Sequence, residues 1–273
     1  MRTPKNPTVL ISALALVLGV ILGLAALFES GWRIGRAGLT HVARGKVCVT
    51  APLAASVLYV DDKQAETSRA SGRELCANLA EGEHTLLLTA PGVWPWWKKI
   101  MIESNEPHAY HAFTLPQTIP QVALEPGTEQ YSIAQNMLVT SLVPSADSPL
   151  RSADASLAVW FDAEARQLRV EWRGEEASLP RRFCEESECE SVITLLANLT
   201  EPLRAIALVP GRDDVVLIAT GSGIYALEIT SAKTPNFQPI YAGTTPTFVL
   251  HGAISIYVGD GSSLFKITLD AGL

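Results

Sequence analysis

The chain has 273 residues with 28 acidic and 21 basic side chains, and its formal net charge is −7. All 28 acids and 19 of the 21 basic residues follow residue 28, so this part of the chain carries a charge near −9. An acidic body without a basic stripe argues against binding of nucleic acid through its phosphates. The hydrophobic content of 48% is enough for a real core, and the length suits one large or two modest domains.

The first element in chain order is an apolar run at 8–28 that contains no charge in its 21 residues. A helix of this length extends for about 31 Å, enough to cross a hydrocarbon core of about 30 Å. The run is longer than the core of a signal peptide, and the sequence AALFES at its end lacks a small-x-small cleavage pattern. We therefore predict an uncleaved transmembrane helix at 8–28, rather than a cleaved signal peptide or a buried helix of a soluble domain.

The charges flanking this run are nearly balanced, with Arg2 and Lys5 before it and Arg33 and Arg36 after it. The short tail at 1–7 and the cysteines discussed below favour a cytoplasmic N-terminus and an extracytoplasmic body. The chain is thus expected at the cell membrane as a single-pass protein.

Small residues recur at helical spacing inside the apolar run, namely Ala15, Gly19 and Gly23. This pattern lets two membrane helices approach closely, so it predicts a helix–helix contact and a homo-oligomer. The competing interpretation is that glycine is simply common in membrane helices.

After a juxtamembrane linker at 29–44, the pattern changes to short strands. Between residues 45 and 116, Gly, Pro and Asp interrupt apolar, β-branched runs at intervals typical of a small all-β sandwich. Four segments carry a resemblance to a known family: GKVCV at 45–49, ASVLYVD at 55–61, LAEGEHTL at 79–86 and PGVWP at 91–95.

These segments resemble the PEGA domain, although Asp62 stands where the family has Gly, and Val93 and Trp94 replace its usual Tyr. The resemblance covers about 45–116. It implies a bacterial surface protein in which this unit has an adhesive or spacer role and no catalytic residue.

A linker at 117–127 is predicted from the prolines at 116, 120 and 126, because proline cannot donate to a strand ladder. Residues 128–273 are again rich in strands, and segments 213–227 and 252–267 share a strand, Gly-Ser turn, strand cadence about 40 residues apart. This sequence looks like β-propeller blades, but its length allows only three to four, near the lower limit of closed propellers. We predict an all-β fold whose propeller-like antiparallel domain is incomplete, open, or completed by a second chain.

The four cysteines are an even number that permits two disulfides in three connectivities: Cys48, Cys76, Cys184 and Cys189. Pairing near neighbours keeps each bond inside one predicted domain. The alternative is four reduced thiols in a cytoplasmic body. Half of a zinc site at Cys184 and Cys189 is poorly supported, because no second close pair of ligands completes it.

Three of the six tryptophans lie together as Trp94, Trp96 and Trp97. They are candidates for an aromatic platform that binds a glycan or dips into a membrane. The competing interpretation, which we favour, is that they form the core and rim of a small sandwich.

Other candidate residues give weaker signals. His108 and His111 would point to opposite faces of a strand, which places them poorly for one metal ion. Loop acids such as Asp213 and Asp260 could ligate calcium, but turn chemistry explains them equally well. The Gly-Ser-Gly sequence at 221–223 lacks the nucleophile-elbow pattern. No metal or other cofactor is expected.

These features predict a non-catalytic, membrane-anchored protein of the cell envelope that binds or scaffolds wall glycan or another surface protein. The alternative is an accessory or degenerate hydrolase with a site in the C-terminal β-domain. A third interpretation is a structural spacer without a ligand.

Overall fold

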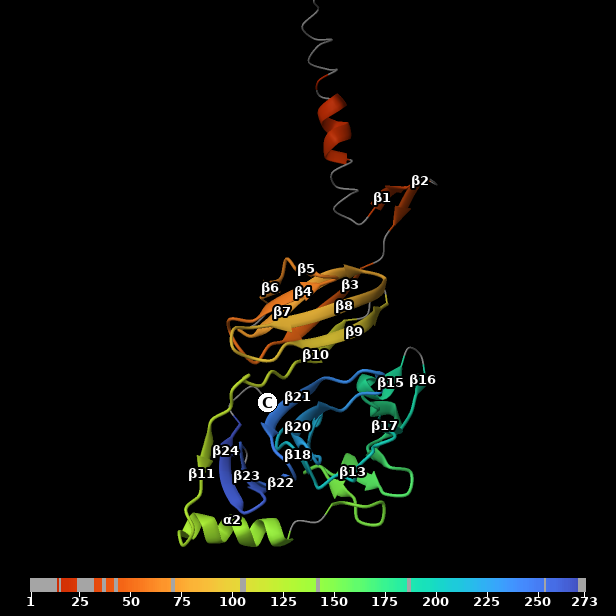
Figure 1. Cartoon of the computed structure of the whole chain (residues 1–273). Coiled ribbons are helices and arrows are strands. Elements are labelled where there is room, and N and C mark those ends of the chain that lie inside the picture. The colour runs from red at the N-terminus through yellow and green to blue at the C-terminus, as the bar shows by residue number, and fades with distance from the viewer. Residues whose placement is uncertain are drawn as a thin grey trace, which may run out of the picture.

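The computed structural model describes residues 14, 16–23, 32–35, 38–41, 44–69, 72–103, 107–140, 143–185, 188–252 and 254–269. The fold is mostly β, with several antiparallel sheets and two short helices (Figure 1). The all-β class predicted from the sequence is thus confirmed at this level.

The N-terminal region contains a helical stretch at 16–23, whose large apolar side chains are all exposed. The part of the chain that the structure describes holds no helix both long enough and apolar enough to span a bilayer. The predicted span at 8–28 lies largely outside the described residues, as does Ala15 of the predicted helix–helix contact. Gly19 and Gly23 are described, and the space beside each is open to 4 Å.

The segment predicted as a juxtamembrane linker contains a short antiparallel pair. Strand β1 (Trp32–Gly35) pairs with β2 (Gly38–His41). This strand pair was not expected in the segment predicted as a linker at 29–44.

The next unit is made of two four-stranded sheets that face each other (Figure 1). One sheet has the order β10-β3-β7-β6 and the other β5-β4-β8-β9. Their strands are β3 (Arg44–Thr50), β4 (Val57–Val60), β5 (Lys63–Gln64), β6 (Ser68–Arg69), β7 (Glu74–Ala80), β8 (Gly82–Thr89), β9 (Trp96–Ile102) and β10 (His108–His111). Alternate residues such as Val47 and Val49 are fully buried between the sheets, as expected for strands with one solvated face.

A two-residue turn joins β4 to β5 in this sandwich. Asp61 and Asp62 both have positive φ, at 49° and 64°, which is the backbone geometry that a tight hairpin turn requires. The Asp61 carboxylate accepts the backbone N–H of Thr85 at 2.9 Å and lies 2.7 Å from His84 Nδ1. The hairpin therefore keeps its shape although Asp62 occupies a position suited to glycine.

Three four-stranded antiparallel sheets form the C-terminal body, whereas in the sandwich β10 pairs with β3 in parallel. The first sheet contains β12 (Leu150–Arg151), β13 (Leu157–Asp162), β14 (Gln167–Trp172) and β17 (Val192–Leu196). The middle sheet contains β18 (Ala205–Leu208), β19 (Val215–Ala219), β20 (Gly223–Glu228) and β21 (Phe237–Ala242). The last sheet contains β22 (Thr247–His251), β23 (Ser255–Asp260), β24 (Ser263–Thr268) and, at its edge, β11 (Gln121–Ala123).

The middle sheet is buried on both faces, which explains the continuous apolar sequence of β19. Val215 and Leu217 pack in one cluster with the last sheet and the sandwich. Val216 and Ile218 pack in a second cluster with the first sheet. A strand covered on both sides loses the polar alternation of a half-exposed strand.

Strand β11 lies inside the segment predicted as a linker at 117–127. It pairs with β24, near the end of the chain, so the last sheet takes its fourth strand from a residue range that precedes the first sheet. The linker interpretation is corrected here: prolines at 120 and 126 bound a strand of three residues instead of excluding one.

Helix α2 (Glu129–Thr140) was not predicted, because residues 128–273 were interpreted as an all-β domain rich in strands. Thr128 caps it, because its Oγ1 accepts the backbone N–H of Tyr131 at 3.2 Å. The buried Ala134 packs with Tyr257 of β23, so the helix covers the face of the last sheet that the middle sheet leaves open.

The three sheets form an open array. Strand β18 contacts both β12 and β22, whereas β12 and β22 share at most a marginal contact within the described residues. No closed propeller is formed by these sheets.

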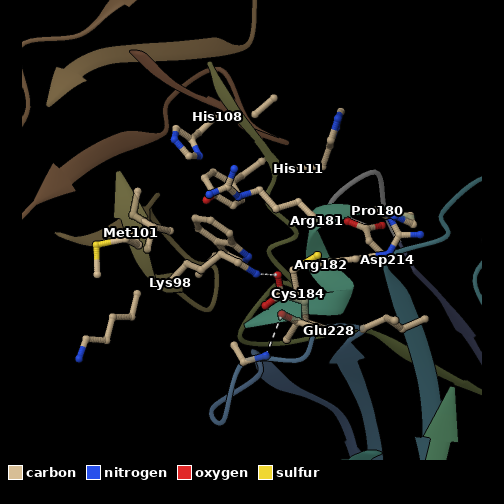
Figure 2. A pocket seen from close by; sticks show the side chains of 18 of the residues that line it. Lys98, Met101, His108, His111, Pro180, Arg181, Arg182, Cys184, Asp214 and Glu228 are labelled. Carbon is tan, nitrogen blue, oxygen red and sulfur yellow. Dashed lines mark hydrogen bonds and ion pairs between the residues drawn. The ribbon is translucent and has the colours of Figure 1, made fainter. Parts of the chain in front are cut away.

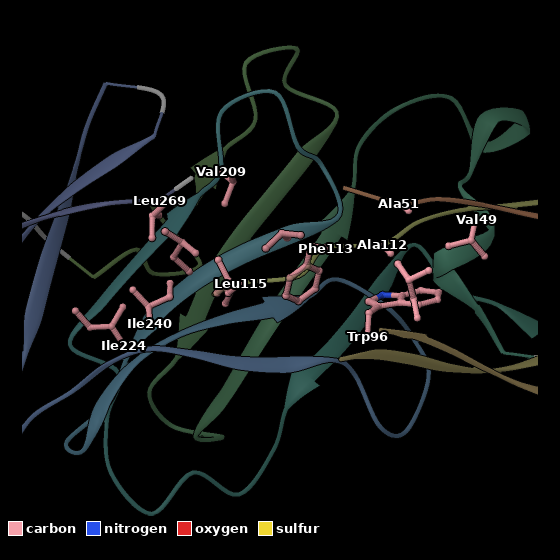
Figure 3. Close-up of a cluster of buried hydrophobic side chains, with 14 of the residues drawn as sticks. Val49, Ala51, Trp96, Ala112, Phe113, Leu115, Val209, Ile224, Ile240 and Leu269 are labelled. Carbon is pink, nitrogen blue, oxygen red and sulfur yellow. The ribbon is translucent and has the colours of Figure 1, made fainter. Parts of the chain in front are cut away.

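The sandwich and the C-terminal body share one hydrophobic cluster (Figure 3). Phe113 and Leu115, which follow β10, lie between Trp96 of the sandwich and Ile240 of the middle sheet. The two predicted domains are therefore packed on a common core and not separated by a free linker.

Candidate binding cavity at the junction of sandwich and C-terminal body

A cavity of about 710 Å³ lies where the sandwich meets the C-terminal body (Figure 2). Strands β9 and β10 form one wall. The opposite wall comes from η2 (Arg181–Phe183), β15 (Cys184–Glu185) and the loops at 211–214 and 229–234. This volume falls in the range of pockets that hold small ligands or short segments of a partner chain.

Four ion pairs line this cavity, and each uses a different acid and a different base. They are Lys98 with Glu228 at 2.6 Å, Lys99 with Glu83 at 2.7 Å, Arg182 with Asp213 at 2.7 Å, and Arg212 with Asp214 at 2.6 Å. The Arg212 pair is bidentate, because a second bond of 2.7 Å joins Nη2 to the other carboxylate oxygen. Each of the four described acids in the wall thus already has a cationic partner.

Tyr110 adds an aromatic face to the cavity. The Lys98 ammonium lies 5.7 Å from the centre of its ring, a cation–π distance. Burial raises the pKa of the Tyr110 phenol; the charge of Arg181 opposes this shift and that of Glu228 adds to it.

Two amide side chains of the middle sheet, at the start of β21, bond the backbone of the sandwich. Asn236 Oδ1 accepts the backbone N–H of Trp97 at 2.9 Å, and Asn236 Nδ2 donates to the Trp97 carbonyl at 2.7 Å. Gln238 Oε1 accepts the backbone N–H of Leu115 at 2.7 Å, while its Nε2 donates to the carbonyls of Pro95 and Phe113. The two amides thus supply hydrogen-bond partners to backbone N–H and carbonyl groups of the sandwich that are buried against β21. Buried polar groups generally have such partners.

The predicted aromatic platform is not assembled as one exposed surface. Trp96 is fully buried in the shared core, Trp94 is half-buried against the same cluster, and Trp97 is 37% exposed. Trp94 lies before β9 and donates its backbone N–H to the Leu115 carbonyl at 2.8 Å. Consecutive residues of a strand point to opposite faces, which separates Trp96 from Trp97.

The four predicted disulfide residues pair as near neighbours, Cys48 with Cys76 and Cys184 with Cys189. Each pair sits directly opposite in an antiparallel ladder, the second between β15 and β16 (Glu188–Cys189). Glu74 is the third member of the one cluster of metal-ligand types found among the described side chains. Both cysteines of that cluster are disulfide-bonded, so it offers no thiolate to a metal.

The weaker candidates are dispersed through the structure. His108 is buried and His111 is exposed, both at the cavity wall. Asp213 is held by Arg182. Asp260 accepts the backbone N–H groups of Thr244 and Thr245, which organises a turn.

Sequence reasoning missed Lys98 and Glu228 of the cavity wall, and Asn236 and Gln238, which bond the C-terminal body to the sandwich. Their partners lie 123 to 143 positions away in the chain, so no local pattern could indicate them. The available signal was their chemistry, because polar residues interrupt apolar strands at Glu228 and Gln238.

Comparison with models of protein families finds no match for this chain. Comparison with curated proteins likewise finds none.

Proposed function

We propose that the chain is a non-catalytic, membrane-anchored protein of the cell envelope that binds or scaffolds wall glycan or another surface protein. The pair of disulfides carries this proposal. Disulfides persist in oxidising, extracytoplasmic compartments and are rare in the cytosol. With the charge-free run at 8–28, they support an N-terminal anchor with the body outside.

In this proposal, residues 45–116 are a PEGA-like sandwich and the C-terminal body is an incomplete propeller of three blades. The support for blades is the chain path: three sheets of four antiparallel strands, of which the last borrows β11 from before the first. The support for the PEGA-like unit is the sequence resemblance together with the tight turn at Asp61 and Asp62.

The junction cavity is the site of binding in this proposal. Its wall carries paired charges and the aromatic rings of Trp96 and Tyr110. Each of the four described carboxylates of the wall is already engaged by a Lys or Arg side chain, which leaves none of them free to approach a substrate as a general acid or base. This favours binding over the alternative of a degenerate hydrolase.

The location is tested by treating cells and spheroplasts with protease and following the full chain. We expect the body to be digested in intact spheroplasts and both disulfides to be present in acid-quenched cells on non-reducing gels. A body protected until the membrane is permeabilised, or four reduced thiols, would overturn the proposed location.

The binding role is tested with the full chain in detergent, against purified peptidoglycan and against the surface proteins of the same cells. We expect retention without release of soluble product. Product release that is lost on replacing Asp213 or Asp260 would establish the hydrolase instead.

A further inference from the structure

Two edge strands of the sandwich line the junction cavity. Strand β9 is the last strand of its sheet, and β10 is the last strand of the other. Lys99 and Met101 of β9, and Ala109 and His111 of β10, are among the lining residues. Figure 2 shows Met101 and His111 at this wall. An edge strand offers one row of backbone groups that its own sheet does not pair.

The hydrogen bonds of Trp97 show which backbone groups of β9 form this row. Both its N–H and its carbonyl bond the side chain of Asn236, so they point away from β8. In an antiparallel ladder the direction alternates along the strand, so every second residue points the same way. Lys99 and Met101 therefore present their N–H and carbonyl groups on the side of Asn236, and not to β8.

The first position of this row is already occupied. Asn236 offers Trp97 one acceptor and one donor, which is what a neighbouring strand would offer at that position. Outside the ladder between β8 and β9, no hydrogen bond to the backbone of Lys99 or Met101 occurs among the described residues. The row thus continues open beyond Trp97 along the cavity wall.

We infer that the open edge of β9 binds an extended polypeptide segment of a partner protein, which adds to the sheet as a further strand in the junction cavity. This rests on the proposed binding role and narrows it to a protein partner. The segment would accept from the N–H groups of Lys99 and Met101 and donate to their carbonyls.

The geometry suits a peptide better than a sugar. Donor and acceptor recur at every second residue of β9, at about 6.8 Å, which is the repeat of another strand. The side chains of Lys99 and Met101 lie on the exposed face of the sheet, and Met101 is 41% exposed, so they leave the edge itself accessible.

The test is residue-resolved amide hydrogen exchange on the full chain in detergent. In the protein alone we expect slow exchange at Lys98 and Ile100 and fast exchange at Lys99 and Met101. The probe is a capped hexapeptide of alternating Thr and Val at millimolar concentration. The probe should slow the amide exchange of Lys99 and Met101 by about tenfold or more, because these N–H groups would then donate to the added strand. A twin peptide N-methylated at every residue should have no effect.

Two variants at one position separate the backbone from the side chain. Met101→Pro removes the outward N–H without removing a bond to β8 and should abolish the protection of Lys99 by the probe. Met101→Val keeps the N–H, so the probe should still protect the Lys99 amide. If Met101→Pro unfolds, the methylated twin alone decides the matter.

Protected Lys99 and Met101 amides in the free protein would overturn the inference. Equal effects of the two peptides, or no effect of the probe, would also overturn it. If the body is extracytoplasmic but the probe does not slow exchange at Lys99 and Met101, the proposed location stands and only the binding site at β9 is refuted. If the probe slows this exchange but the body is cytosolic, the binding site stands and the proposed location is refuted.

Discussion

Lys98 Nζ lies 2.6 Å from Glu228 Oε1, and this ion pair joins strand β9 of the sandwich to the end of β20 in the middle sheet. Both side chains are largely buried, at 13% and 9% exposure. The other oxygen of Glu228 accepts Nδ2 of Asn236 at 2.7 Å. One carboxylate therefore binds the side chain of Lys98 in β9 and also the amide that bonds the backbone of the neighbouring residue, Trp97.

Removal of Glu228 should destabilise the protein strongly, because it leaves the Lys98 ammonium buried without a partner. Glu228→Ala is expected to lower the free energy of unfolding by about 3–5 kcal/mol, measured by urea titration. The double variant Lys98→Met, Glu228→Leu should recover most of this loss. Lys99→Ala, which breaks the exposed pair with Glu83, is the matched control and should cost less than about 1 kcal/mol. A cost for Glu228→Ala as small as the control would contradict the buried pair.

Asn236 should matter through the backbone of Trp97. Asn236→Ala leaves an N–H and a carbonyl of β9 unsatisfied at a part-buried site, with an expected loss of about 2–3 kcal/mol in unfolding free energy. Asn136→Ala on the exposed surface of α2 is the control and should change little. Amide exchange of Trp97 should accelerate in Asn236→Ala only; unchanged exchange there would refute the bond.

The strands and both disulfide pairs could be predicted from the sequence because their signals are local. Apolar runs bounded by Gly, Pro and Asp mark β3, β8, β19 and β23. Near-neighbour pairing of the cysteines needed only an even count and a preference for short separations.

The pairing of distant strands could not be predicted in this way. Strand β11 has three residues between prolines and is ordered by β24, about 140 positions later. Helix α2 follows a Thr cap that sequence reasoning passed over, and only Ala134 of its residues is buried, so its apolar pattern is faint. Long-range contacts of single polar residues, such as Gln238 with Leu115, leave no periodic signal at all.

The turn at Asp61 and Asp62 offers a stabilising substitution. Asp62 has φ of 64°, a conformation that glycine adopts without steric cost. Asp62→Gly is expected to raise the free energy of unfolding by about 0.5–1 kcal/mol, whereas Asp62→Ala should lower it. Thermal unfolding of the two variants in parallel tests this, and a lower Tm for Asp62→Gly would contradict the turn geometry.

The two disulfides should differ in their contribution to stability. The Cys48–Cys76 bond closes a loop of 28 residues and the Cys184–Cys189 bond closes one of 5. Loop-closure entropy gives about 3.6 kcal/mol for the longer loop and about 2 kcal/mol for the shorter. The double variant Cys48→Ala, Cys76→Ala should therefore unfold at lower urea than Cys184→Ala, Cys189→Ala. The reverse order would show that native-state packing around the hairpin outweighs loop length.

Asp154 gives a pH-dependent prediction. Hydrogen bonds from the hydroxyls of Ser152 and Ser156, and then from the Ser156 N–H, lower the pKa of the Asp154 carboxyl to about 2. Because the folded pKa lies below the ordinary value of 3.8, the carboxylate favours the folded state above that pH. This contribution should decline as the pH falls from 3.8 through about 2.

A carboxyl-detected NMR titration should place the Asp154 midpoint near 2 in the parent chain. Ser152→Ala removes the hydroxyl that contributes most to the shift, so the midpoint should rise toward the ordinary value. Ser178→Ala, whose hydroxyl donates to the Glu175 carbonyl instead, is the matched control and should leave it unchanged. A midpoint near the ordinary value in the parent chain would mean that the serine hydroxyls donate elsewhere, and the turn at 152–156 would then lack its organising carboxylate.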